Sequence, residues 1–163
     1  MAKEIELKIR LEDPEDFQSR LNTKARLEGP YHKADTYFRG PAGSFRVREG
    51  ERPVVCRKEK TIQEGIEVNR ETEFEVDDAD AFRSFALSLG YQEWYRKEKH
   101  GQAWRWGDIL IEVGTVSDLG WFAELELILE DQPDSGAVDR ARQTLLAALE
   151  ALQIPRNSIE TKT

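Results

Sequence analysis

The fold is predicted from one stretch near the start of the chain, Glu4-Ile5-Glu6-Leu7-Lys8-Ile9-Arg10-Leu11. Apolar and charged residues alternate strictly along it. Successive side chains of a β-strand point to opposite faces, so one strand places two carboxylates, a lysine and an arginine in a single row. A half-buried strand with a solvated outer face explains one such octet, because alternation of this kind is common. The prediction therefore depends on whether other strands repeat the charged row.

The composition limits the class of protein. The 163 residues predict a single domain over residues 1–163, and the net charge of −8 argues against sequence-independent nucleic-acid binding, which needs a basic surface. Cys56 is the one cysteine, so an internal disulfide is excluded and a reducing compartment is favoured. The chain begins without an apolar signal core, and no apolar run approaches the roughly 20 residues of a membrane span. We expect a soluble, cytoplasmic protein without a nucleic-acid or membrane partner; a homodimer is left open.

Charged and apolar residues alternate again in most of the later strands that the sequence predicts. The expected strands cover residues 35–38, 44–48, 54–60, 65–76, 94–99, 103–106, 109–113 and 121–129, with breaks at Gly29-Pro30, Gly101 and Gly107-Asp108. Three amphipathic helices are predicted as well. The first covers residues near 14–24, the second follows Asp77-Asp78 and carries Phe82, Phe85, Ala86 and Leu89, and the third is opened by Pro133-Asp134-Ser135 and carries Val138, Ala141, Leu145, Leu149 and Leu152.

So many charged rows predict a closed interior rather than a solvated sheet face. We expect an α+β fold, an eight-stranded antiparallel β-barrel that is closed or nearly closed, with a polar interior and amphipathic helices outside. Its interior holds Glu4, Glu6, Glu73, Glu75, Glu112, Glu124 and Glu126 together with Lys8, Arg10, Arg46, Arg48, Lys58, Lys97, Lys99 and Arg105, of which Arg10 and Arg105 are expected near the rim. Such ions cannot be buried dry, so the interior requires water, counter-ions or a charged ligand.

The two sets of charges indicate a chemistry. Clustered carboxylates raise one another's pKa unless a cation lies among them, and oxygen-only ligands suit Mg²⁺ or Mn²⁺ rather than zinc. Arginines and lysines that face the same cavity suit a polyphosphate. A metal ion with a basic clamp is the equipment for phosphoryl or nucleotidyl transfer.

Several motifs carry a resemblance to a known family. Glu4-x-Glu6-x-Lys8 resembles the ExExK signature of the CYTH, or triphosphate tunnel metalloenzyme, superfamily. Further matches are Asp35-Thr36-Tyr37-Phe38, Phe45-Arg46-Val47-Arg48, Val55-Cys56-Arg57-Lys58, Glu73-Phe74-Glu75 and the ending Leu119-Gly120-Trp121-Phe122-Ala123-Glu124-Leu125-Glu126. ExExK alone is a weak signal, but the set in this order, on one parity, is specific.

The resemblance implies an eight-stranded antiparallel tunnel that binds a triphosphate end-on with one or two Mg²⁺ or Mn²⁺ ions. It implies a metal-dependent triphosphatase, acting on tripolyphosphate or thiamine triphosphate, or a class IV adenylyl cyclase that converts ATP to cAMP and pyrophosphate. The expected catalytic residues are Glu4, Glu6 and Lys8; the substrate ligands Lys8, Arg46, Arg48, Lys58, Lys97 and Lys99; and the metal ligands Glu4, Glu6, Glu73, Glu75, Glu112, Glu124 and Glu126.

Three positions depart from the family pattern. Asn69 and Glu71 stand where a basic residue usually precedes the central ExE, Lys97-Glu98-Lys99 replaces Lys-x-Arg, and Gly114 stands where the family has an aspartate. Glu112 lies two residues earlier on the same face, so we expect it to take the place of that aspartate. The departures keep an alternative open, a non-catalytic module that binds polyphosphate or a nucleotide.

Overall fold

The computed structural model describes residues 2–130, 134 and 136–161, and it contains a barrel with helices around it. Three α-helices and a 3₁₀ turn, η1, accompany the eight strands in this part of the chain. The elements in chain order are β1 Ala2–Arg10, α1 Pro14–Asn22, β2 Arg26–Gly40, β3 Gly43–Arg48, β4 Val54–Gln63, β5 Ile66–Glu75, α2 Ala79–Ser88, β6 Gln92–Trp106, β7 Ile109–Val116, β8 Trp121–Leu129, α3 Ala137–Ala151 and η1 Arg156–Ser158.

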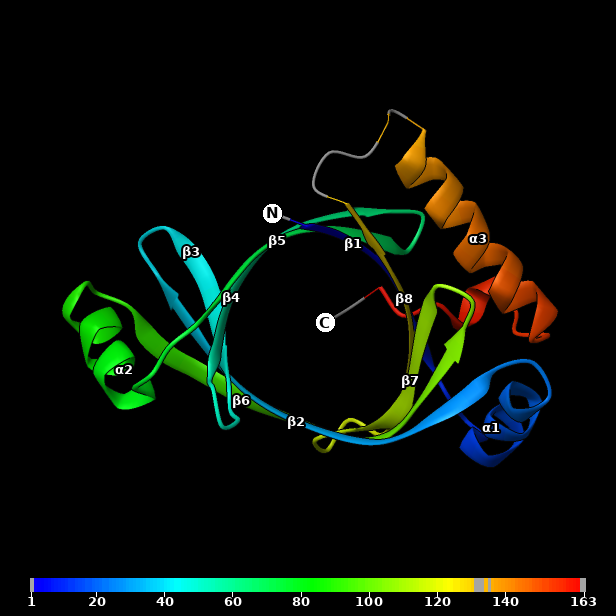
Figure 1. Cartoon of the computed structure of the whole chain (residues 1–163), viewed down its shortest axis with the longest axis horizontal. Helices are drawn as coiled ribbons and strands as arrows, with labels where there is room; N and C mark the ends of the chain where they lie inside the picture. The colour runs from blue at the N-terminus through cyan, green and yellow to red at the C-terminus, as the bar shows by residue number, and fades with distance from the viewer. Residues whose placement is uncertain (1, 131–133, 135, 162–163) are drawn as a thin grey trace.

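The strands close into a ring in the order β1-β5-β4-β3-β2-β6-β7-β8, and every neighbouring pair is antiparallel (Figure 1). The predicted closed antiparallel barrel is therefore confirmed. The contacts of β1 with β5 and β8 complete the ring, so the alternating octet at the start of the chain is the closing strand. Closure gives each strand one face toward the interior and one toward the outside.

The outer face of β1, β7 and β8 carries the hydrophobic core. Ile5, Leu7 and Ile9 are fully buried there, and α3 covers them with Leu145 and Leu149. The alternation that places aliphatic side chains outside sends the glutamates and lysines of β1 inward. Figure 1 shows α1 and α3 on the side of the barrel formed by these strands, and α2 beside the opposite wall.

Both predicted aspartate caps are present. The Asp13 carboxylate accepts from the Asp16 amide at 3.0 Å, and the Asp78 carboxylate accepts from the Ala81 amide at 3.0 Å. Gly90, predicted to end α2, has a φ of +91°, a conformation that glycine adopts at little cost. Helix starts are therefore read reliably from these local signals.

The third helix and the second need corrections. Of the predicted start at Pro133-Asp134-Ser135, residues Pro133 and Ser135 lie outside the described residues, and α3 begins at Ala137. Of the stripe predicted for α2, only Ala86 is buried, whereas Phe85 and Leu89 are exposed. The periodicity of α2 is correct, but its apolar face meets little of the barrel.

Two predicted breaks are wrong. The strand predicted at 35–38 begins at Arg26, because Gly29 and Pro30 pair with β6 and the ladder continues past them through a bulge between Leu27 and Gly29. The predicted strands 94–99 and 103–106 form one strand, β6, that passes through Gly101. A Cβ at Gly101 would lie 2.0 Å from the Val113 carbonyl oxygen, so this glycine permits a close strand pair rather than a turn.

Two isoleucines in neighbouring strands test the assignment of inside and outside. Ile111 of β7 is fully buried under the helices, and Ile128 of β8 is 68% exposed. We expect Ile111→Ala to lower the free energy of unfolding by about 2–5 kcal/mol, since it removes apolar contacts and leaves a cavity. Ile128→Ala should change it by less than about 0.5 kcal/mol. Urea denaturation of both variants measures this, and equal effects would contradict the packing described above.

Candidate active site

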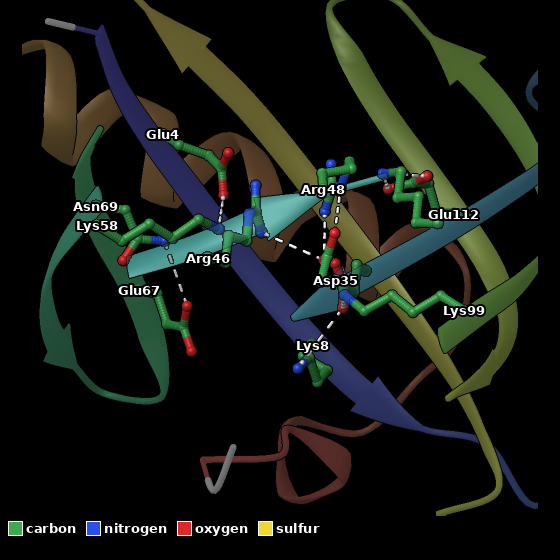
Figure 2. Close-up of polar contacts among 12 residues, drawn as sticks. Glu4, Lys8, Asp35, Arg46, Arg48, Lys58, Glu67, Asn69, Lys99 and Glu112 are labelled. Atoms are coloured by element: carbon green, nitrogen blue, oxygen red, sulfur yellow. Dashed lines mark hydrogen bonds and ion pairs between the residues drawn. The ribbon is translucent and has the colours of Figure 1, made fainter. Parts of the chain in front are cut away.

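The interior of the barrel holds a cavity of about 410 Å³ in which acidic and basic side chains are equally numerous. Eight carboxylates and eight cations line it: Glu4, Glu6, Glu67, Glu71, Glu73, Glu112, Glu124 and Glu126, with Lys8, Lys33, Arg46, Arg48, Lys58, Lys60, Lys97 and Lys99. Figure 2 shows a part of this set reaching inward from several strands. The balance of charge explains how so many ions share one enclosed space.

Three carboxylates of β1 and β8 form a cluster. Glu6 and Glu126 are register partners, and one oxygen from each of Glu4, Glu6 and Glu126 lies within 4.8 Å of the others. Oxygens bound to an octahedral Mg²⁺ at 2.0–2.1 Å lie about 3 to 4 Å apart, so small side-chain shifts bring this cluster to that geometry. The donor set fits Mg²⁺ or Mn²⁺ and lacks the nitrogen and sulfur that softer metals prefer.

The electrostatics of the cluster favour a cation. Burial, with the nearby charge of Glu124 and the contact with Glu4, raises the pKa of Glu6 well above its ordinary value. Burial and the charge of Glu4 raise the pKa of Glu126 to about 7. Burial alone would also raise the pKa of Glu4, but hydrogen bonding with Glu6 and the charge of Lys58 lower it. Without a cation, the protonated forms of Glu6 and Glu126 are therefore favoured, and a bound cation would favour the ionised forms instead.

Two other carboxylates predicted as metal ligands are held by lysines. Glu124 lies 2.8 Å from the Lys99 Nζ and 3.6 Å from the Lys8 Nζ, and Glu112 lies 2.7 Å from the Lys33 Nζ. Burial opposes the ionised form of Glu124, but Lys99 and Lys8 bring its pKa well below the ordinary range. These two carboxylates act as counter-ions for the lysines in the structure.

The carboxylates of β5 lie toward one end of the barrel. Glu73 lines the cavity, half exposed, with an oxygen 3.9 Å from Arg46. The structure does not bring Glu75 to the cavity; this side chain is exposed and pairs with Arg52 at 3.4 Å. Its parity is that of the interior, but its position lies beyond the cavity's end.

Arg46 and Arg48 share a counter-ion, Asp35, that was not among the predicted site residues. Asp35 is 1% exposed and accepts two hydrogen bonds from Arg48, at 2.7 and 2.8 Å (Figure 2). Arg46 lies 3.9 Å from the same carboxylate. Burial opposes ionisation of Asp35, but Arg48 lowers its pKa. The side chain therefore orients the arginine pair.

Arg46 retains a free donor. Its Nε is buried and has no hydrogen-bond partner among the described residues. A buried donor without an acceptor is costly, and an anion in the cavity would supply one. We interpret Arg46 as the arginine with the most capacity for a ligand.

Lys97 also has unused capacity to bind an anion. It forms no ion pair with a carboxylate of the described residues, and its Nζ lies over the rings of Tyr37 and Tyr95, at 5.3 and 5.8 Å from their centroids. Burial and the charges of Lys99 and Lys8 lower the pKa of Lys97 to about 8. Tyr37, predicted only to pack, lines the cavity and stacks on Tyr95 at 4.5 Å.

Comparison with known proteins agrees with this geometry. The family model of the CYTH domain matches residues 2–163. The chain belongs to the CYTH domain family. A relative of Methanocaldococcus jannaschii, "Putative adenylate cyclase MJ0240", is 23% identical, and the alignment covers 98% of this chain and 95% of the relative.

Solved structures show the same fold. The PH1012 protein of Pyrococcus horikoshii superposes with a TM-score of 0.83 at 22% identity, over 98% of this chain and 96% of that one. The Hippeastrum protein named "Putative adenylyl cyclase HpAC1", for which a dominant triphosphatase activity is described, gives 0.62 at 17% identity, over 99% and 91% of the two chains. In the described part of this CYTH chain, no helix is both long and apolar enough to cross a membrane.

The departure from the CYTH pattern at Gly114 has a steric reason. A Cβ at this position would lie 2.0 Å from the His100 carbonyl oxygen and 2.7 Å from the Tyr31 hydroxyl. An aspartate therefore does not fit, and Glu112, two residues earlier, faces the cavity from the same strand. Glu112 therefore lies on the cavity side as expected, and its replacement of the family's aspartate stays a prediction.

The departures on β5 change the charge beside the carboxylate cluster. Asn69 is fully buried, and its Nδ2 donates to Glu67 at 3.3 Å. Glu71 and Glu4 both pair with Lys58, at 3.2 and 3.4 Å, and burial together with Glu4 raises the pKa of Glu71. These replacements make the neighbourhood of Glu4 more acidic.

The remaining predicted cations lie away from the main cavity. Arg10 lines a second cavity of about 410 Å³ at the C-terminal end of β1, with Lys8 and Lys97, and pairs with Glu160 at 3.6 Å. Arg105 pairs with Glu28 at 3.6 Å and does not line the barrel cavity. The expectation that both are rim charges agrees with these positions.

Sequence reasoning missed several residues that line the cavity, namely Lys33, Tyr37, Glu67, Trp94 and Tyr95, and also the buried counter-ion Asp35. Most belong to parts of β2 and β6 that the sequence predicted as breaks or strand ends. The signal for Asp35 and Tyr37 was available, since they share a parity within the predicted strand 35–38. A longer predicted β2 would have added Lys33 to the same row.

The low pKa of Lys97 predicts a pH dependence of anion binding. Its pKa of about 8 lies below the ordinary 10.5, and an anion beside Nζ favours the charged form. We therefore expect inorganic tripolyphosphate to bind with proton uptake above pH 8, and its affinity to fall as pH rises from 8 to about 10.

Calorimetry in two buffers of different ionisation enthalpy measures this uptake. Lys97→Met should remove it, whereas Lys24→Met, at an exposed position outside the cavity, should keep it. Titration of the anion itself is common to all three proteins and cancels in the comparison. Equal proton uptake by wild type and Lys97→Met would show that Lys97 does not meet the anion.

Proposed function

We propose that this CYTH protein is a divalent-metal-dependent enzyme that acts on a triphosphate compound inside the barrel. One observation carries the proposal: the acidic cluster of Glu4, Glu6 and Glu126 shares a cavity with Arg46 and Lys97, two cations with unused capacity. A cluster of carboxylate oxygens beside basic groups with unused capacity suits a cation and a polyanion bound together. The names of the relatives, a cyclase and a protein with triphosphatase activity, agree with a triphosphate substrate.

Glu4, Glu6 and Glu126 are the residues that would hold Mg²⁺ or Mn²⁺. Such an ion, when bound, neutralises charge on the phosphate oxygens and supplies Lewis acidity. Glu73 lies near enough to Arg46 to orient it. Because Glu124 and Glu112 already pair with lysines, we assign them to the positioning of those lysines rather than to the metal.

The basic side chains bind and orient the phosphates. Arg46 and Lys97 meet the anion directly; Lys8, Lys58 and Lys99 exchange part of their pairing with glutamates for phosphate oxygens. Arg48 is fixed by Asp35, so it contributes charge from a set position. Positioning and neutralisation of this kind provide most of the catalysis in phosphoryl transfer.

Hydrolysis is the reaction that we place first. The oxygen of a water molecule forms a bond to the terminal phosphorus, the bond from that phosphorus to the bridging oxygen breaks, and phosphate and a diphosphate compound leave. The water loses its proton to a carboxylate of the cavity or to solvent.

Cyclisation of ATP is the second candidate, and the aromatic edge of the cavity favours it. Trp94 and Tyr95 line the cavity and are 51% and 38% exposed, so they offer faces on which a base can stack. In that reaction the ribose 3′-oxygen attacks the α-phosphorus and pyrophosphate leaves.

A substrate screen tests the proposal. ATP, thiamine triphosphate and inorganic tripolyphosphate are incubated with the protein and Mg²⁺ or Mn²⁺, and cAMP, pyrophosphate and phosphate are resolved. Phosphate release identifies a triphosphatase, and cAMP with pyrophosphate identifies a cyclase. If none of the three compounds turned over with either metal, the enzyme assignment for these substrates would be wrong.

Substitutions of two predicted metal ligands, Glu6 inside the cavity and Glu75 outside it, test which carboxylates hold the metal. Glu6→Gln should lower metal-dependent turnover about a hundred-fold or more, because Lewis-acid stabilisation is worth several kcal/mol. The fold should survive, since the raised pKa of Glu6 already favours the neutral acid that Gln resembles. Glu75→Gln, outside the cavity, should keep wild-type turnover. Initial rates over a metal titration measure both, and wild-type rates in Glu6→Gln would exclude it as a ligand.

Substitution of Arg46 tests anion binding independently of catalysis. A charge-assisted hydrogen bond contributes about 1.5–3 kcal/mol, so Arg46→Ala should weaken tripolyphosphate binding about ten- to a hundred-fold. Arg52→Ala is the matched control, since Arg52 is exposed and pairs with Glu75. Calorimetry at fixed ionic strength, with and without Mg²⁺, measures both. Tight binding without turnover of any screened compound would favour the non-catalytic module. Unchanged affinity in Arg46→Ala would contradict both the enzyme and the binding module.

A further inference from the structure

We propose a second metal site on the outer face of the barrel, built from His32, Glu98 and His100 and suited to a transition metal such as Zn²⁺, Ni²⁺ or Cu²⁺. These are the two histidines of the whole chain, and the strand pair β2–β6 brings them together as direct register partners. One ligand atom from each of the three residues lies within 4.8 Å of the others.

Strand alternation separates this site from the tunnel. Lys33 and Lys99, the neighbours of the two histidines in β2 and β6, line the cavity, so the histidines face outward. Glu98 lies two residues before His100 and therefore shares its outer face. Both imidazole side chains are more than half exposed, which leaves the site open to solvent and to metal ions.

The distances fit a tetrahedral metal. The Glu98 Oε2 lies 3.4 Å from the His32 Nε2 and 3.3 Å from the His100 Nε2. Ligands at 2.0–2.2 Å from a tetrahedral Zn²⁺ are about 3.4 Å apart, so the two nitrogen–oxygen distances match edges of such a site, and the two nitrogens lie within 4.8 Å of each other. The rings stack at 4.2 Å with an angle of 14° between their planes, so the imidazoles would turn out of this stack to direct both Nε2 lone pairs at one ion. A water molecule would complete the coordination.

The carboxylate is held in place for this contact. Arg96 binds the Glu98 Oε1, which leaves Oε2 toward the imidazoles, and Glu49 offsets the charge of Arg96 at 3.2 Å. The backbone of Glu98 is fixed too: its amide donates to the Ser117 Oγ at 3.0 Å, and its carbonyl accepts from the Ser117 amide at 2.7 Å.

The donor types distinguish the two sites. Two imidazole nitrogens with one carboxylate oxygen suit Zn²⁺, Ni²⁺ and Cu²⁺, whereas the oxygen-only cluster of the tunnel suits Mg²⁺ and Mn²⁺. A ring of ordinary hydrogen bonds among His32, Glu98 and His100 is the competing explanation, and it predicts no affinity for a metal. A titration therefore separates the two explanations.

The test is a Zn²⁺ titration of the untagged full chain in the presence of excess Mg²⁺, followed by NMR of the imidazole protons. Because the chain has two histidines, the spectrum contains two sets of ring signals. We expect both sets to shift together and to saturate at one equivalent of Zn²⁺. Ring signals that stay in place while Zn²⁺ is added in excess would overturn the proposal, and this measurement needs no variant.

Calorimetry on variants locates the ligands. His32→Gln and His100→Gln should each weaken Zn²⁺ binding more than about ten-fold, while Glu126→Gln, in the tunnel, should bind Zn²⁺ at this site like wild type. Mg²⁺-dependent turnover of the histidine variants should stay at the wild-type level, so failure of this proposal is distinct from failure of the proposed function. Wild-type Zn²⁺ affinity in both histidine variants would show that the cluster is a hydrogen-bonded surface group and not a metal site.

Discussion

The structure depends on one constraint: ions inside a closed barrel must be neutralised by one another. An ion that leaves water loses solvation worth several kcal/mol, and only a close partner restores it. The pairs Lys99–Glu124, Lys33–Glu112 and Arg48–Asp35 meet that requirement at 2.7–2.8 Å. Helices on the outside can then bury the aliphatic face of the same strands without competing with the charged interior. Fold and site are two consequences of one alternation.

The candidate site lies where this neutralisation is incomplete. Among the described residues of the cavity, Glu6 and Glu126 have pKa values raised by burial and by neighbouring carboxylates, the buried Arg46 Nε has no acceptor, and Lys97 forms no ion pair. A barrel selected for stability alone would pair these groups with each other. Their separation leaves room for a cation beside one set and an anion beside the other, which is why we place metal and phosphate binding here.

A sequence shows on which face of a strand a side chain lies, but it shows less well how far the cavity extends along that strand. The octet at β1 and the strand 121–129 gave the correct inward side chains, because strict alternation fixes the face of every residue. It does not fix how far the tunnel reaches, so Glu75 has interior parity and an exposed side chain. Bulges and close strand pairs are harder still: Gly29 and Gly101 look like breaks, yet both permit strands to continue. Lys33, which pairs with Glu112, was missed for that reason.

The ladder between β2 and β6 shows how much depends on register. It holds Lys33, Asp35, Lys97 and Lys99 toward the interior, and the His32, Glu98 and His100 cluster toward the exterior. A slip of one residue would exchange the two faces and place imidazoles in the tunnel and lysines among the solvent-facing side chains. Irregularities between Leu27 and Gly29 and between Tyr37 and Phe38 lie on either side of the stretch that holds these residues in register. The irregularities that conceal these strands in the sequence thus determine which charges reach the cavity.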